Sequence, residues 1–425
     1  MRVLSADWVV PVEGDPIRDG AVRIADDGTI ADVGPAADIG TGERFEGCVI
    51  LPGLVDCHSH LEYAVYAGFG DGLPFSSWIG MHVSRKSLLD FDEMRAIATD
   101  GAHECLRSGI TTVGDCGFVG AAAEAAAETG LRAVVYLEVF GRDVSALARF
   151  EELRERVAPA LSDRVGLGVS PHAPYTCTLE LYEACAAQGL PVATHLAESV
   201  SERLYLLDGS GDWSAFSELL VPPPGTTGIR LLAAAGLLGP STMAAHCVDV
   251  DDEEIGLLAQ SGVGVAHCPR SNGFLGCGVA PLEELLAAGI PVGIATDSPA
   301  STPSFDMFEE LRTAIVAARA RAGRPDALSA ARALELATLG GARVLGMDGE
   351  VGSLLPGKQA DVAVVSLEGS PFDPVEDPAA AVVLGGSPDR VAATLVHGED
   401  RYRRGTSAWP DSRNAARRAR SRMLR

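Results

Sequence analysis

The 425-residue sequence lacks several features that mark particular classes of protein. No uncharged apolar run reaches about 18 residues, so we expect no membrane-spanning helix. The nine cysteines include no C-x-x-C pair, which predicts reduced thiols in a cytoplasmic protein. The N-terminal stretch MRVLSADWVVPVEGD has an acidic residue within its apolar part and no cleavage-site pattern, so it does not resemble a signal peptide.

Positive charge is also scarce in this sequence. Lysine and arginine together number 34 against 58 acidic residues, which gives a formal net charge of −24. Such a charge argues against nucleic acid or an anionic membrane as partner, because polyanions are repelled. Lysine occurs only at Lys86 and Lys358. A hydrophobic content of 47% over this length predicts a globular protein with a large α/β domain and a smaller companion.

The two ends of the chain share a sequence pattern that the middle lacks. Residues 1–50 show short alternating strands, with a hairpin signal around Asp27–Gly28, and residues 358–398 return to the same pattern. We therefore predict a small β-sandwich domain built from residues 1–50 together with 356–405. The basic segment 406–425 is expected to be a terminal helix, a subunit contact or a disordered tail.

Eight short apolar runs recur through residues 51–355, and most are separated by helix-like stretches such as FDEMRAIATDGAHECLRSG. Continuous apolar strands that alternate with helices are typical of parallel sheets, and eight such units predict a closed (β/α)8 TIM barrel. A doubly wound sheet is the alternative, and the absence of a G-x-G-x-x-G turn disfavours it.

Polar side chains gather at the C-terminal ends of these runs, which converge on one mouth of a barrel. Six of the nine histidines fall there, whereas His82, His103 and His397 lie outside the pattern. A lone histidine at a strand end is usually a hydrogen-bonded core residue, but convergence of six is typical of a site. The residues at the strand ends are His58, His60, His172, His195, Glu198, His246, His267 and Asp297.

Three imidazoles and one carboxylate, those of His58, His60, His195 and Asp297, suit one divalent cation with an open position for water. Zinc is the expected ion, and iron or manganese would fit the same ligands. Glu198, three residues after His195, is placed to move a proton between water and substrate, and His246 could orient the attacked centre. His267 could instead serve as a hydrogen-bonding support, and Asp297 could merely cap the following helix.

The motifs PGLVDCHSH, SPHAPYT, THLAES, AHCVDVD, VAHCPRSN and ATDSPAS together resemble the amidohydrolase superfamily over residues 1 to about 400. They are most similar to its branch of mononuclear-metal deaminases and chlorohydrolases. The resemblance implies metal binding by His58, His60, His195 and Asp297, and catalysis by Glu198, His246 and Asp297. Two-metal members usually carry a carboxylated lysine at the end of the fourth strand, and the run VGLGVSPHA has none, which favours one metal ion.

Within that branch the motifs look most like the aminofutalosine (aminodeoxyfutalosine) deaminases of an alternative menaquinone pathway. Those enzymes convert a 6-aminopurine nucleoside to its 6-oxo form and release ammonia. A deaminase of 5′-methylthioadenosine and S-adenosylhomocysteine is the second hypothesis. The motifs also leave open a guanine deaminase, a chlorohydrolase, a ring-opening amidase, or a barrel that binds metal or ligand without catalysis. The resemblance also implies a homo-oligomer.

Candidate substrate contacts are less specific than the metal ligands. By the resemblance, His172 would approach a ribose hydroxyl, whereas Ser77 stands where related deaminases often have a ribose-binding acid. The aromatic residues Phe69, Phe75 and Trp78 could wall an aromatic base or form a hydrophobic plug. The predicted substrate-binding residues are His172, Glu62, Trp78, Arg142 and Arg270.

Overall fold

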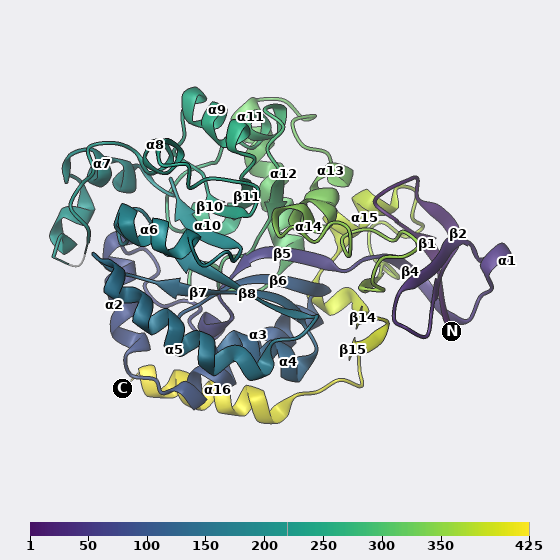
Figure 1. Cartoon of the computed structure of the whole chain (residues 1–425). Helices are drawn as coiled ribbons and strands as arrows, with labels where there is room; N and C mark the ends of the chain where they lie inside the picture. Colours follow the sequence, from purple (N-terminus) through teal and green to yellow (C-terminus); the bar gives the residue numbers. More distant parts are fainter. Residues whose placement is uncertain (219, 425) are drawn as a thin grey trace.

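The computed structural model describes residues 1–218 and 220–424, and it contains two β-sheets flanked by helices (Figure 1). The larger sheet has eight strands in chain order, and each adjacent pair is parallel. These strands coincide with the eight apolar runs of the sequence, which confirms the predicted barrel class. They are β5 (Leu54–Ser59), β6 (Ile110–Gly117), β7 (Arg132–Val139), β8 (Val165–Pro171), β9 (Val192–Leu196), β10 (Thr242–His246), β11 (Gly264–His267) and β12 (Val292–Ile294).

The first and last strands of the barrel meet just beyond the end of β12. The Asp297 amide donates to the His58 carbonyl at 3.0 Å, and the His60 amide donates to the Asp297 carbonyl at 2.9 Å. A parallel bridge joins Ser59 and Asp297. Closure of the barrel therefore places residues from sequence positions about 240 apart on hydrogen-bonded neighbouring backbones.

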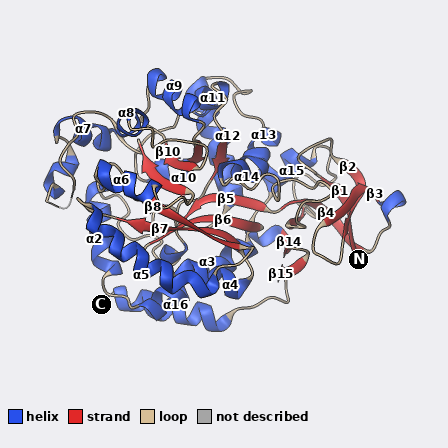
Figure 2. Ribbon diagram, in the orientation of Figure 1, coloured by secondary structure: helices blue, strands red, loops and turns tan. Residues whose placement is uncertain are grey.

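Helices cover the outside of the barrel (Figure 2). Several begin at a side-chain cap: Asp90 and Glu93 form a reciprocal capping box at the start of α3, as do Asp251 and Glu254 at α9. The longer helices are α2 (Phe75–Lys86), α3 (Phe91–Arg107), α4 (Ala121–Thr129), α5 (Leu147–Val157), α6 (Leu179–Ala186), α7 (Val200–Asp208), α8 (Gly228–Ala234), α9 (Asp252–Ser261), α12 (Met307–Ala322), α15 (Pro378–Gly385) and α16 (Pro410–Met423).

The shorter helical segments lie mainly in the connections at the barrel ends and in the sheet domain. They are α1 (Ala36–Ile39), α10 (Pro269–Phe274), α11 (Leu282–Ala287), α13 (Ala330–Glu335), α14 (Gly341–Val344), η1 (Leu61–Tyr63), η2 (Val144–Ala146), η3 (Ala158–Ala160), η4 (Asp212–Phe216), η5 (Leu336–Gly340) and η6 (Pro388–Arg390).

Two apolar clusters stabilise the barrel, one on each side of its wall. The larger packs the strands against the surrounding helices, with Val113, Val135 and Ile294 among its fully buried members. The smaller includes Val55, Tyr136 and other residues of β5, β6, β7, β9, β10 and β11. Because its members come from strands all around the barrel, this second cluster fills the barrel interior.

The two ends of the chain form one seven-stranded mixed sheet in the order β15-β14-β13-β4-β1-β2-β3. The hairpin predicted at Asp27–Gly28 joins β2 and β3, and Gly28 there has a φ of +79°. The two halves meet again where the Ala360 amide donates to the Gly28 carbonyl at 2.9 Å, so the sheet folds around its own core. Its strands are β1 (Arg2–Val9), β2 (Ile17–Ile24), β3 (Ile30–Pro35), β4 (Glu43–Pro52), β13 (Val362–Ser366), β14 (Val391–Val396) and β15 (Glu399–Arg403).

The basic segment after this sheet forms helix α16, which returns along the barrel and packs against α3 (Figure 1). His103 on α3 stacks on Trp409 with a ring-centroid distance of 4.2 Å. At the other end of α16, the Arg420 guanidinium donates to the Ala67 carbonyl at 2.9 Å. The helix therefore holds the loop that connects β5 to α2.

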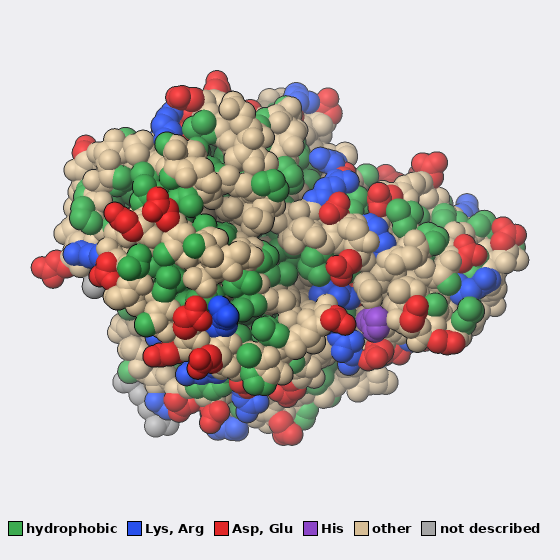
Figure 3. All heavy atoms as spheres, viewed as in Figure 1, with side chains coloured by type: hydrophobic (Ala, Val, Ile, Leu, Met, Phe, Trp, Pro, Cys, Tyr) green, Lys and Arg blue, Asp and Glu red, His purple; other side chains and the backbone are tan. Residues whose placement is uncertain are grey.

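Acidic and basic side chains are interspersed over the face shown in Figure 3, with no single large patch of one sign. Within residues 1–218 and 220–424, no helix combines the length and the apolar character that crossing a bilayer requires.

Candidate active site

The imidazoles predicted as metal ligands converge at the mouth of the barrel. The Nε2 atoms of His60 and His195 lie 3.3 Å apart. Oδ1 of Asp297 lies 3.4 Å from Nε2 of His60 and 3.6 Å from Nε2 of His58. All four side chains are buried, although they come from β5 and the residue that follows it, from β9, and from the segment after β12.

Hydrogen bonds on the far side of each ring fix which nitrogen faces the centre. Nδ1 of His60 lies 2.8 Å from the Cys116 carbonyl, and Nδ1 of His195 lies 2.9 Å from the His172 carbonyl. Since a carbonyl only accepts, each Nδ1 carries the proton and each Nε2 presents a lone pair to the centre. Burial lowers the pKa of His195 to about 4 and that of His60 well below its usual value, so both rings are neutral near pH 7.

Asp297 is held as a carboxylate with one oxygen free. The hydroxyls of Ser271 and Ser301 donate to Oδ2 at 2.7 and 2.6 Å, which leaves Oδ1 facing the histidines. Burial alone would raise the pKa of Asp297, but the nearby imidazoles of His58, His60 and His246 hold it well below its usual range. Its φ of +59° is strained for an aspartate, a feature that is concentrated at functional sites.

This arrangement fits a divalent metal ion. A tetrahedral zinc site with bonds of about 2.0–2.1 Å separates its ligand atoms by about 3.3–3.4 Å, close to the 3.3, 3.4 and 3.6 Å distances found here. Nε2 of His58 is buried with no hydrogen-bond partner among the described residues, as expected of a nitrogen that coordinates a metal ion. His58, His60, His195 and Asp297 would hold the ion.

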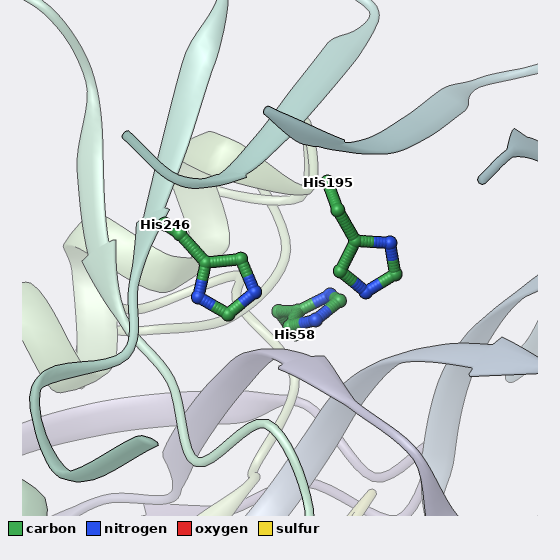
Figure 4. A group of neighbouring side chains, drawn as sticks. All are labelled: His58, His195 and His246. Atoms are coloured by element: carbon green, nitrogen blue, oxygen red, sulfur yellow. The ribbon is translucent and has the colours of Figure 1, made fainter. Parts of the chain in front are cut away.

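Glu198 and His246 lie beside this centre without belonging to the four-ligand set. The rings of His58, His195 and His246 point toward one another in Figure 4, and one nitrogen of each lies within 4.8 Å of the others. Nδ1 of His246 lies 3.0 Å from Oδ1 of Asn272, and its Nε2 lies 3.7 Å from Oε1 of Glu198. Burial, together with the negative charges of Asp297 and Glu202, raises the pKa of Glu198 well above its usual value.

A cavity of about 380 Å³ opens directly onto these groups. This volume is in the range of about 300–1,000 Å³ that is typical of sites for small organic ligands. Its outer part is aromatic, with Phe75, Trp78, Tyr175 and Trp213 on the wall. The structure thus places His172 and Trp78 on the cavity wall, as the sequence predicted, whereas Phe69 and His267 are absent from it.

Glu62 does not reach the cavity, and its predicted substrate contact is wrong. Its carboxylate accepts hydrogen bonds from the amides of Phe118, Val119 and Ala121 at 2.8, 3.0 and 2.8 Å. These amides belong to the turn before α4 and to its first residue, so Glu62 caps that helix. The carboxylate is fully used by the protein itself.

The two predicted arginine contacts are wrong for the same kind of reason. Arg142 is exposed and donates to the carbonyls of Ser217 and Glu218, away from the cavity wall. Arg270 is buried against Glu309 at 3.1 Å and Glu310 at 3.4 Å, and its guanidinium anchors α12 rather than a ligand. The nine cysteines are free and buried, as expected of inert thiols.

Two charged residues on the cavity wall were not predicted from the sequence, Lys86 at the end of α2 and Glu138 in β7. Burial raises the pKa of Glu138 to about 8, although the charge of Lys86 opposes this shift. A carboxylate oxygen of Glu138 lies within 4.8 Å of ring nitrogens of His60 and His195. Glu138 stands near the C-terminal end of an apolar run, which is the signal that identified the other site residues.

Neutral imidazoles, an ionised aspartate and a buried carboxyl group with a raised pKa lie together at the mouth of a (β/α)8 barrel. These features define a metal-dependent hydrolase. The chain belongs to the amidohydrolase family, whose model, described as "Amidohydrolase family", matches residues 49–400.

Similar proteins agree with this assignment. The chain is 35% identical over 412 residues to a 5-methylthioadenosine/S-adenosylhomocysteine deaminase of Moorella thermoacetica, with 93% of each chain covered. It is 34% identical over 396 residues to a 5′-deoxyadenosine deaminase of Methanothermobacter thermautotrophicus, with 90% of this chain and 89% of that one covered. A solved adenosine deaminase from Xanthomonas campestris with bound zinc superposes with a TM-score of 0.88 at 29% identity, covering 99% of this chain and 98% of that one.

Proposed function

We propose that this protein is a zinc-dependent deaminase of adenosine derivatives modified at the 5′ position, with 5′-methylthioadenosine and S-adenosylhomocysteine as the leading substrates. The relatives described above support this choice over 6-aminodeoxyfutalosine, which none of them is named for. The observation that carries the proposal is the position of Glu198, whose pKa is raised by burial, beside His246 and a group of residues that fits a metal ion, on the wall of an aromatic cavity.

In this reaction water replaces the 6-amino group and ammonia leaves. The ion, when bound, supplies Lewis-acid activation of water. Glu198 holds a proton for the ring nitrogen next to the attacked carbon. Asp297, ionised and with Oδ1 facing the centre while two serine hydroxyls hold Oδ2, can accept a proton from the attacking water. His246, whose Nδ1 is fixed by Asn272, directs Nε2 toward the same place and orients the attacked centre.

The aromatic part of the cavity can accommodate the purine and an apolar 5′ substituent. Offset stacking on Trp78 or Trp213 suits a flat heterocycle. All nine cysteines are free, which supports a reducing compartment and hence the cytoplasm.

The test is ammonia release from the zinc-loaded protein, together with the spectral change from adenine to hypoxanthine. The panel contains 5′-methylthioadenosine, S-adenosylhomocysteine, 5′-deoxyadenosine, adenosine, 6-aminodeoxyfutalosine, guanine and a chlorotriazine. We expect the first three to have the highest kcat/KM. Removal of the metal with dipicolinate should abolish turnover, and added zinc should restore it. Absence of ammonia from every adenine nucleoside at full metal loading would refute the proposal.

A further inference from the structure

Two ionisable side chains on the cavity wall, an acid and a base, have no part in the reaction described above. Lys86 ends helix α2, and Glu138 is the penultimate residue of β7. Both line the cavity beside His60 and His195, and Glu138 is only 3% exposed. A buried carboxyl group without a hydrogen-bond partner is unfavourable in either protonation state, so we expect a ligand to supply that partner.

Contacts within the described part of the chain leave both groups incompletely satisfied. Lys86 is close enough for its charge to oppose the rise in the pKa of Glu138, but no hydrogen bond or ion pair joins the two side chains among the described residues. Nζ of Lys86 lies 3.3 Å from the Tyr63 hydroxyl and 3.6 Å from the centroid of the Phe118 ring. An ammonium carries three N–H donors, so Lys86 retains donors for a ligand.

The position of Glu138 limits which part of a ligand it can reach. One of its oxygens lies within 4.8 Å of ring nitrogens of both His60 and His195, so it faces the reacting centre rather than the outer aromatic wall. The carboxyl group of Glu138 has an oxygen that accepts hydrogen bonds in either protonation state, and the Lys86 ammonium donates them. Together they complement a group that offers a donor beside an acceptor.

We propose that Glu138 and Lys86 form a paired recognition site for a substrate group that places a hydrogen-bond donor next to an acceptor, and that this pair determines specificity. The inference rests on the proposed function and deepens it. In an adenine nucleoside two groups have this chemistry: the vicinal diol of the sugar, and the edge of the base where an amino group adjoins a ring nitrogen.

The pair is tested with the variants Glu138→Gln and Lys86→Met in the zinc-loaded full chain. The matched control is Lys358→Met, because Lys358 is the other lysine of the chain and pairs with Glu13 at 3.3 Å in the sheet domain. We expect the two cavity variants to raise KM about 100-fold with little change in kcat, since an unmatched buried polar group is what discriminates between ligands. The metal content should stay at one ion per chain in all variants.

Substrate analogues show which of the two groups, the sugar diol or the base edge, the pair binds. If the pair binds the diol, the wild-type protein discriminates about 100-fold against 2′,3′-dideoxyadenosine, and Glu138→Gln loses that preference. If the pair binds the base edge, the wild type accepts the dideoxy compound and free adenine, and the variant loses both. Unaltered KM values in both variants would refute substrate recognition by the pair. Loss of metal from Glu138→Gln would also refute it, because Glu138 would then be a metal ligand.

Amine labelling gives a measurement that does not need a variant. Lys86, Lys358 and the α-amine are the amines of the chain that acetic anhydride can acetylate, and mass spectrometry resolves them. Bound inosine, the product of adenosine deamination, should slow modification of Lys86 about tenfold and leave Lys358 unchanged; equal rates with and without inosine would contradict the pair. A wild-type protein that deaminates no adenine nucleoside refutes the proposed function and the pair with it, whereas normal turnover with unprotected Lys86 refutes the pair alone.

Discussion

Substitution of Glu62 by glutamine separates a structural role from a substrate role at this position. The carboxylate accepts the amides of Phe118, Val119 and Ala121, the last of which begins α4. A glutamine keeps one acceptor oxygen, and its NH₂ group then faces an amide that also donates. Hydrogen bonds to a charged acceptor contribute about 1.5–3 kcal/mol each, so the loss of one or two predicts destabilisation by about 3 kcal/mol.

The assay is urea unfolding followed by circular dichroism, combined with steady-state kinetics of ammonia release. We expect a lower unfolding midpoint for Glu62→Gln and a KM within about twofold of wild type, because the carboxylate points away from the cavity. Glu128→Gln, on the exposed face of the same helix, is the matched control and should change stability by less than about 0.5 kcal/mol. Unchanged stability with a tenfold higher KM would refute the capping role and restore the substrate contact.

Three further changes have expected outcomes. Glu198→Gln should lower kcat by about 10²–10⁴ without loss of metal by elemental analysis, and near-normal turnover would exclude Glu198 as the acid. Asp361→Ala should lower the free energy of unfolding, measured in urea, by about 3–5 kcal/mol. The Arg132 guanidinium, now bonded to Asp361 at 2.9 Å, would then remain buried as an uncompensated charge. A smaller loss of stability would show that water reaches this guanidinium. Burial, aided by Arg85, lowers the pKa of His82 to about 4. Because the unfolded chain then takes up the proton first, stability should fall as the pH drops from about 6.5 to 4, by about 3 kcal/mol, and His82→Phe should flatten that slope.

The metal centre could be predicted from the sequence because its geometry follows from the backbone. His58 and His60 are two residues apart at a strand end and therefore share a face. His195 and Asp297 end other strands of the same barrel, and parallel strands present these ends at one mouth. The backbone alone brings these side chains close together, so the positions of the apolar runs and of their ends were enough to predict the metal ligands.

The substrate contacts could not be predicted in the same way, because they depend on what surrounds each side chain. Whether Glu62 faces a ligand or caps a helix depends on the turn before α4, more than fifty residues later in the chain. Arg270 forms ion pairs with Glu309 and Glu310 instead of contacting a ligand, and these two residues lie on a helix that follows another strand. Glu138 is different, because its place near the end of an apolar run gives the same signal as the histidines, and that signal would have been sufficient to predict it.

The sheet domain imposes an order on synthesis, because β4 pairs with β13 about 310 residues further along the chain. At about 5–20 residues per second, a ribosome needs about 15–60 s to make the intervening barrel. During that time β1 to β4 can pair with one another, but the edge of β4 that β13 will cover stays open, with its backbone amides and carbonyls ready to join strands of other chains. The nascent protein is thus most prone to aggregate at the exposed edge of its N-terminal strands, which are synthesised first. We expect the folding yield in cells to depend on a chaperone that shields this edge.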